Sequence, residues 1–144
     1  MILPVKGVIA LDTAPLIYLV ERHSVYAARL TPLWHAAARG EVVLIISELA
    51  VSEALVLPIR QYNKPLIHAY ELILELPGIR VEPLTWPILR HAAELRAGSS
   101  SLKMPDAIHI ATADLTGCDA FITNDKTLRN VAFPEVVIVD DLEA

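Results

Sequence analysis

The segment GVIALDTAPLIYLV, residues 7–20, starts as a strand-length apolar run and continues after Asp12 with a helical pattern. Short apolar runs of this kind recur at 42–46, 79–83, 119–123 and 136–139. Between the runs lie segments with helical periodicity, at 14–20, 25–39, 48–59, 64–76, 86–97 and 105–116. Strands that alternate with helices predict a three-layer α/β/α fold around a central parallel sheet of four to five strands.

The length and composition fit one globular domain over residues 1–144. The hydrophobic fraction is 54%, against about 45–50% in typical globular chains, which excludes a disordered chain. Only 20% of the residues are charged, so we expect some apolar surface to stay exposed or to meet a partner. The stretch GSSSLK, residues 98–103, is expected to be a surface loop within the domain.

The charge balance argues against a protein that holds nucleic acid through a dominant basic surface. Lys and Arg number 12 and Asp and Glu 17, for a net charge of −5. An enzyme that meets nucleic acid through a bound metal remains compatible with this charge. The single cysteine, Cys118, forms no internal disulfide, and Asp12 and Pro15 interrupt the apolar N-terminal stretch. We therefore expect a cytoplasmic protein without a membrane segment.

Two acids follow strand-like runs. Asp12 comes directly after residues 7–11, and Asp125 lies just past 119–123, with Thr123 and Asn124 before it. In a parallel sheet, ligands bind outside the carboxyl ends of the strands, so these acids are candidates for a site. Taken alone, Asp12 is better explained as a helix N-cap, and a turn or cap explains Asp125 as well as a site does.

Two more acids lie in helical segments. Glu53 has only apolar residues three and four positions away, which predicts a buried helix face and a nearby cation or donor for its carboxylate. Glu48 lies in the first turn of the same helix, where the helix dipole accounts for it. Asp106 follows Pro105 at a helix start, and the helix dipole is again an alternative explanation.

His109 lies three residues after Asp106, and an acid and a histidine at this spacing can bind a metal. Its neighbours Ile108 and Ile110 favour a partly buried, hydrogen-bonded histidine instead, and we leave it out of the predicted site. Four acids at one rim without matching cations repel one another. A divalent ion explains them best, and oxygen-only ligands favour Mg²⁺ or Mn²⁺.

Four segments together resemble the PIN domain, and the compact length resembles the VapC-type toxin ribonucleases. The segments are LDTAPLIY (11–18), ISELAVSEAL (46–55), LKMPDAIHIATA (102–113) and FITNDKTL (121–128). The resemblance covers residues 7 to 139 and places the family's acidic quartet on Asp12, Glu53, Asp106 and Asp125. The family's frequent Ser or Thr near the last acid falls on Thr123, beside Asn124. Many toxins of this type have Asn where Asp125 stands.

By this resemblance we expect metal-dependent endonucleolytic cleavage of RNA, in which Mg-bound or Mn-bound water attacks the phosphorus. Asp12 and Asp106 would be the principal ligands, and Glu53 and Asp125 would act directly or through water. The resemblance also implies a homodimer and a cognate antitoxin, with the apolar helix faces at 14–20 and 48–57 as candidates for its groove. Nearby cations are candidates for phosphate contacts, namely Lys103, Lys126 and Arg129.

Two other function classes remain open. One is a PIN-like binding module without catalysis, which the complete quartet argues against. The other is an aspartyl-phosphate phosphotransfer enzyme, since an Asp after the first parallel strand also occurs in that chemistry. The dehalogenase-like pattern expects a second acid two residues later, where this chain has Ala14, and paired acids appear only at Asp140 and Asp141.

Overall fold

The computed structural model describes residues 1–132 and 134–143. Its centre is a five-stranded parallel sheet in the order β3-β2-β1-β4-β5. The strands are β1 (Gly7–Leu11), β2 (Val42–Ser47), β3 (Ile79–Glu82), β4 (Ala120–Thr123) and β5 (Glu135–Ile138). The helices are α1 (Thr13–Val20), α2 (Tyr26–Ala38), α3 (Glu48–Arg60), α4 (Lys64–Ile73), α5 (Trp86–Ala97) and α6 (Met104–Leu115). Two short 3₁₀ turns follow the last two strands, η1 (Lys126–Leu128) and η2 (Val139–Asp141).

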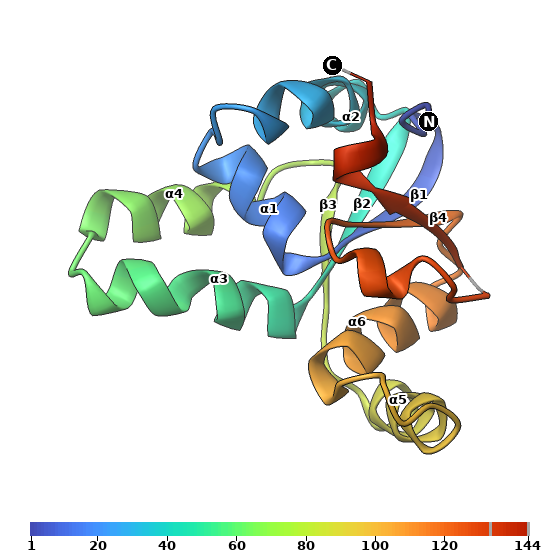
Figure 1. Cartoon of the computed structure of the whole chain (residues 1–144). Helices are drawn as coiled ribbons and strands as arrows, with labels where there is room; N and C mark the ends of the chain where they lie inside the picture. The colour runs from blue at the N-terminus through green and yellow to red at the C-terminus, as the bar shows by residue number, and fades with distance from the viewer. Residues whose placement is uncertain (133, 144) are drawn as a thin grey trace.

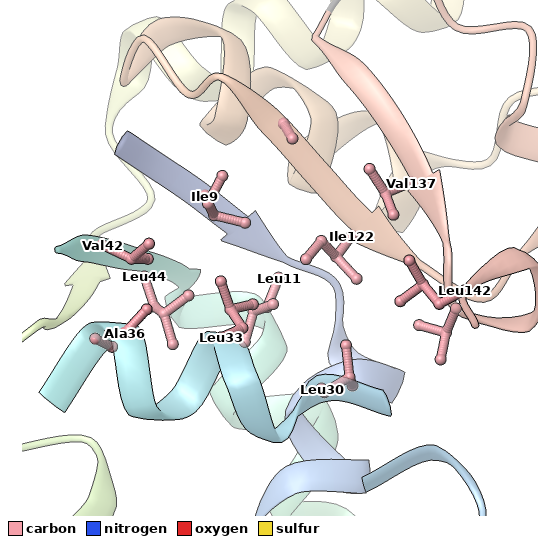
Figure 2. Close-up of a cluster of buried hydrophobic side chains, with 13 residues drawn as sticks. Ile9, Leu11, Leu30, Leu33, Ala36, Val42, Leu44, Ile122, Val137 and Leu142 are labelled. Atoms are coloured by element: carbon pink, nitrogen blue, oxygen red, sulfur yellow. The ribbon is translucent and has the colours of Figure 1, made fainter. Parts of the chain in front are cut away.

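Helices cover both faces of the sheet, and the predicted three-layer parallel architecture is confirmed (Figure 1). On one face, α2 packs against alternate strand residues, and Figure 2 shows Leu33 of α2 near Leu11 and Leu44. On the other face, Ile110 of α6 packs in a cluster with Phe121. Residues facing both layers are apolar, which explains why the strands are continuous apolar runs.

Local signals set the element boundaries close to their predicted positions. Thr85 caps α5 and Ser47 caps α3, each accepting a backbone N–H of the helix. Pro105 lies in the first turn of α6, where its missing N–H costs nothing. Residues 98–103 form a connection between α5 and α6, as predicted. The two 3₁₀ turns are additional elements.

Helices α3 and α4 form a hairpin that projects away from the sheet (Figure 1). Several of its apolar side chains are exposed, namely Val56, Leu57, Ile59 and Leu72. The expectation of exposed apolar surface is therefore confirmed. Within the two described ranges, no helix is long and apolar enough to cross a membrane.

Candidate active site

Asp12 and Asp125 follow the neighbouring strands β1 and β4, and the backbone N–H of Asp12 donates to the Ile122 carbonyl at 2.9 Å. After β1 the chain forms β2 and β3 on one side of β1, and it then crosses to form β4 and β5 on the other side. The crevice at such a reversal is where open α/β sheets bind ligands. The carboxyl ends of β1 and β4 therefore carry two acids at the usual ligand position of this architecture.

Thr123 connects these two acids. Its buried hydroxyl donates to Asp12 Oδ2 at 2.7 Å and accepts the backbone N–H of Asp125 at 3.1 Å. Asp12 Oδ1 also accepts the Thr13 N–H at 2.8 Å, so Asp12 caps α1, and Asp125 caps η1 through Thr127. The capping explanation and the site explanation are thus compatible, because each carboxylate oxygen has more than one lone pair.

Glu53 lies on α3, and the prediction that it occupies a buried helix face is wrong. Its side chain is 37% exposed, and Val56 and Leu57 beside it are about half exposed. The expectation of nearby donors holds, since Glu53 Oε1 accepts the Thr13 hydroxyl at 2.8 Å. The periodicity located an apolar face of α3, but it could not show that this face is open to solvent.

His109 of α6, which is not one of the predicted site residues, lies beside Glu53 and Asp12. Its side chain is only 3% exposed, and Nε2 is 2.8 Å from Glu53 Oε1 and 3.7 Å from Asp12 Oδ1. It is a buried, hydrogen-bonded histidine as predicted, but its partner is a candidate site residue. The spacing of three residues from Asp106 was the one sequence signal for this position.

Asp106 is electrostatically coupled to the other acids. Burial of its carboxyl raises its pKa, and the negative charges of Asp12 and Asp125 raise it further. His109 and Lys103 act in the opposite direction. A carboxyl whose neighbours disfavour its charged form is a candidate for a functional site, because a bound cation relieves the repulsion.

A cavity of about 790 Å³ opens beside Asp106 and Asp125, between α6, η1 and the loop before α6. Its lining includes the apolar residues Leu102 and Ile110 and the cationic Lys103. Hydroxyl and amide groups also line it, from Ser99, Ser101, Thr127 and Asn130. Apolar walls with a few polar groups are typical of ligand sites.

The donor set suits a hard divalent cation in its chemistry, since the acids supply oxygen ligands and raise the pKa of Asp106. Within residues 1–132 and 134–143, however, no three His, Cys, Asp or Glu side chains are close enough to hold a metal ion as they stand. The oxygens of Asp12 and Asp125 are directed to local donors instead. Cation binding at this edge would draw the carboxylates toward a common point.

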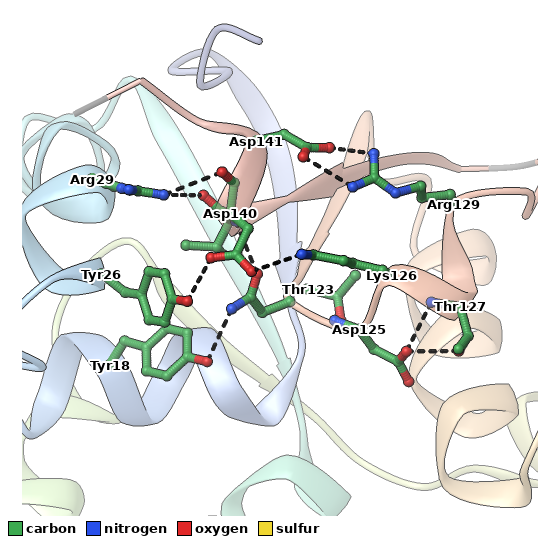
Figure 3. A network of polar contacts seen from close by, with 12 residues as sticks. Tyr18, Tyr26, Arg29, Thr123, Asp125, Lys126, Thr127, Arg129, Asp140 and Asp141 are labelled. Carbon is green, nitrogen blue, oxygen red and sulfur yellow. Dashed lines mark hydrogen bonds and ion pairs between the residues drawn. The ribbon is translucent and has the colours of Figure 1, made fainter.

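Lys126 and Arg129, two of the predicted phosphate contacts, lie in a group of polar contacts with Asp140 and Asp141 (Figure 3). The Asn124 side chain joins the Tyr18 hydroxyl to the backbone N–H of Asp140. Lys126 pairs with Asp140 and Arg129 pairs with Asp141, so both cations already have carboxylate partners. Lys103 borders the cavity and is the better placed of the three predicted cations.

The chain is thus a parallel α/β protein with acidic side chains at the carboxyl ends of β1 and β4, where the strand order changes direction. This is the position at which such folds usually bind ligands. Residues 9–134 match the model of the PIN domain, and the chain belongs to the PIN domain family.

Solved structures with the same fold include toxin–antitoxin proteins. A toxin–antitoxin complex from Klebsiella pneumoniae has 24% identity and a TM-score of 0.70, covering 90% of this chain and 96% of that one. VapBC2 from Rickettsia felis, bound to a promoter DNA fragment, has 15% identity, coverages of 91% and 98%, and a TM-score of 0.69. VapC20 from Mycobacterium tuberculosis, a Sarcin-Ricin loop cleaving toxin, has 19% identity, coverages of 85% and 95%, and a TM-score of 0.67. The comparison with curated proteins found no match.

Proposed function

We propose that the chain is a metal-dependent endoribonuclease and the toxin of a type II toxin–antitoxin pair. The observation that carries the proposal is the coupling of Asp106 to Asp12 and Asp125 at the carboxyl ends of the strands, beside an open cavity. Membership of the PIN domain family and the likeness to an RNA-cleaving toxin support it. Neither competing function class gains support, because the acidic quartet is complete and the aspartyl-phosphate pattern is not.

Asp12, Glu53, Asp106 and Asp125 would hold Mg²⁺ or Mn²⁺, and Thr123 would keep Asp12 in place through its hydroxyl. When bound, such an ion makes water more acidic and offsets phosphate charge. Lys103 would contact the RNA backbone from the cavity lining, and the hydroxyl and amide groups there would contact sugar or base. The four acids carry negative charge toward the substrate, so RNA binding would depend on the cation.

Metal removal tests this function. We expect the purified chain, freed of any partner, to cleave single-stranded or loop RNA with Mg²⁺ or Mn²⁺ and to lose cleavage in excess EDTA, because the carboxylates alone repel phosphate. Gel analysis of labelled RNA should show products with a 5′-phosphate and a 3′-hydroxyl. Restoration by Mn²⁺ after EDTA is the control, and full activity in EDTA would contradict the proposal.

We further propose a homodimer and a protein antitoxin as partners. The exposed apolar side chains of the α3–α4 hairpin support association, as do the toxin–antitoxin complexes with the same fold. Several large apolar side chains exposed on one hairpin are a candidate interaction site. Light scattering of the purified chain should give twice the mass of one chain. A monomer at all accessible concentrations would contradict the homodimer and leave the antitoxin to be tested by co-purification.

A further inference from the structure

The contact between His109 and Glu53 has a defined direction. A carboxylate only accepts hydrogen bonds, so His109 Nε2 carries the hydrogen that Glu53 Oε1 accepts at 2.8 Å. The same oxygen accepts the Thr13 hydroxyl at 2.8 Å. One oxygen of Glu53 is therefore held from both α6 and α1, and the described residues place no hydrogen bond on its other oxygen.

Glu53 needs this support more than Asp12 and Asp125 do. Asp12 and Asp125 have short side chains that accept hydrogen bonds from adjacent backbone N–H groups. Glu53 has a longer side chain that is 37% exposed, and a side chain of this kind retains much rotamer freedom. The imidazole of His109 is fixed in place by burial, since it is only 3% exposed, and it can therefore restrict the rotamers of Glu53.

His109 is not explained as a core residue. In the described part of the chain its buried Nδ1 has no hydrogen-bond partner, and an unsatisfied buried polar atom costs stability. An apolar side chain of similar size would avoid this cost at the same buried position. What requires a histidine is therefore the set of Nε2 contacts, of which the one with Glu53 Oε1 at 2.8 Å is the shortest and the one with the Thr13 hydroxyl is 3.4 Å long.

We propose that His109 is a positioning residue of the acidic site, which fixes the Glu53 carboxylate beside Asp12 so that its second oxygen can bind a divalent cation. The inference rests on the proposed function and deepens it. Hydrogen-bond partners that orient ligating carboxylates are a general feature of metal sites, and their loss typically lowers metal affinity or activity about 10- to 100-fold. His109 Nε2 is also 3.7 Å from Asp12 Oδ1, so its N–H lies close to both acids.

The test compares Mn²⁺ affinity and thermal stability in the full chain without RNA. For His109→Leu we expect Mn²⁺ binding by calorimetry to weaken roughly 10- to 100-fold. We expect the midpoint of metal-free thermal unfolding to stay the same or rise, because an unsatisfied buried atom is removed. His109→Gln places an amide donor near the Nε2 position and should bind Mn²⁺ more tightly than His109→Asn, whose shorter side chain cannot reach Glu53.

The matched control is His91→Leu, which removes a similar histidine–carboxylate contact, 2.6 Å long, between α5 and Asp114. It should leave Mn²⁺ affinity unchanged. Equal Mn²⁺ affinity in wild type and His109→Leu would overturn the role of His109 alone. If His109→Leu does not fold, equal affinity of the Gln and Asn variants would overturn it. Absence of Mn²⁺ binding by the wild type would overturn the proposed metal site and this role together.

Discussion

Asp106→Asn is expected to abolish RNA cleavage, with a fall in kcat/KM of more than about 100-fold. Loss of a residue that only orients a metal ligand costs about 10- to 100-fold, and loss of a principal ligand should cost more. The substitution keeps the size and shape of the side chain and removes its negative charge. The measurement is the initial rate of RNA cleavage at saturating Mn²⁺.

The same substitution is expected to leave the metal-free protein at least as stable as the wild type. Burial and the charges of Asp12 and Asp125 raise the pKa of Asp106 above its value in the unfolded chain. The folded wild type therefore binds the proton more tightly, and it loses stability as the pH rises from below the usual Asp pKa through the raised value. Asparagine has no proton to lose and gains no charge, so the stability of the variant relative to wild type should grow over this pH range.

Chemical unfolding of both proteins between about pH 4 and pH 7 checks this sign. Glu135→Gln is the control, because it removes one exposed carboxylate from the amino end of β5. The candidate site lies at the opposite, carboxyl ends of the strands. It should cleave RNA at the wild-type rate. An Asp106→Asn protein that is inactive but less stable than wild type would point to misfolding instead of a lost ligand, and an active one would refute the proposed role of Asp106.

Thr123→Val is expected to have the second largest effect, on both activity and stability. The side chain is fully buried, and valine fills the same space without the hydroxyl. Asp12 then loses a donor, and the backbone N–H of Asp125 loses its acceptor. We expect cleavage to fall roughly 10- to 100-fold, as for other residues that orient metal ligands. The free energy of unfolding should fall by about 1–3 kcal/mol, the usual cost of a buried polar group left unpaired.

Thr123→Ser is the matched variant, because it keeps the hydroxyl and removes only a methyl group. It should retain most of the cleavage activity while losing some stability from the deleted methyl. Urea unfolding and steady-state cleavage separate the two contributions. Wild-type cleavage by Thr123→Val would show that the contact with Asp12 is not needed, whereas equal loss in both variants would indicate a packing effect.

The fold and part of the site could be predicted because their signals are local. A strand such as VVLII is apolar on both faces, so both faces must be covered by other elements. Acids such as Asp12 and Asp125 come just after such strands along the chain. Strand ends of a parallel sheet meet at one edge, so the position of these two acids follows from the topology alone. Glu53 and Asp106 were candidates from their positions in helical segments, and the PIN resemblance then placed the family's quartet on all four acids.

The missed features depend on contacts between residues far apart in the sequence. His109 meets Glu53 across 56 positions, and no periodicity within α6 indicates that partner. Lys126 and Arg129 were candidates for phosphate contacts because they lie near Asp125 in the sequence. In the structure they pair with Asp140 and Asp141, which lie 14 and 12 positions further along the chain. The exposed face of α3 was taken for a buried one because apolar spacing alone does not distinguish them.

The acids of the candidate site lie on elements that differ in how firmly they are attached to the sheet. Asp12 follows β1 and donates its backbone N–H to β4, and these are two of the three inner strands of the sheet, whereas Glu53 belongs to the α3–α4 hairpin, which extends beyond the sheet (Figure 1). Inner strands are typically among the last elements of a protein to open. A local opening of this hairpin would withdraw Glu53 while Asp12, Thr123 and Asp125 stay in place. Such an opening would separate Glu53 from the other acids without unfolding of the sheet, and faster hydrogen exchange in α3 than in β1 would report it.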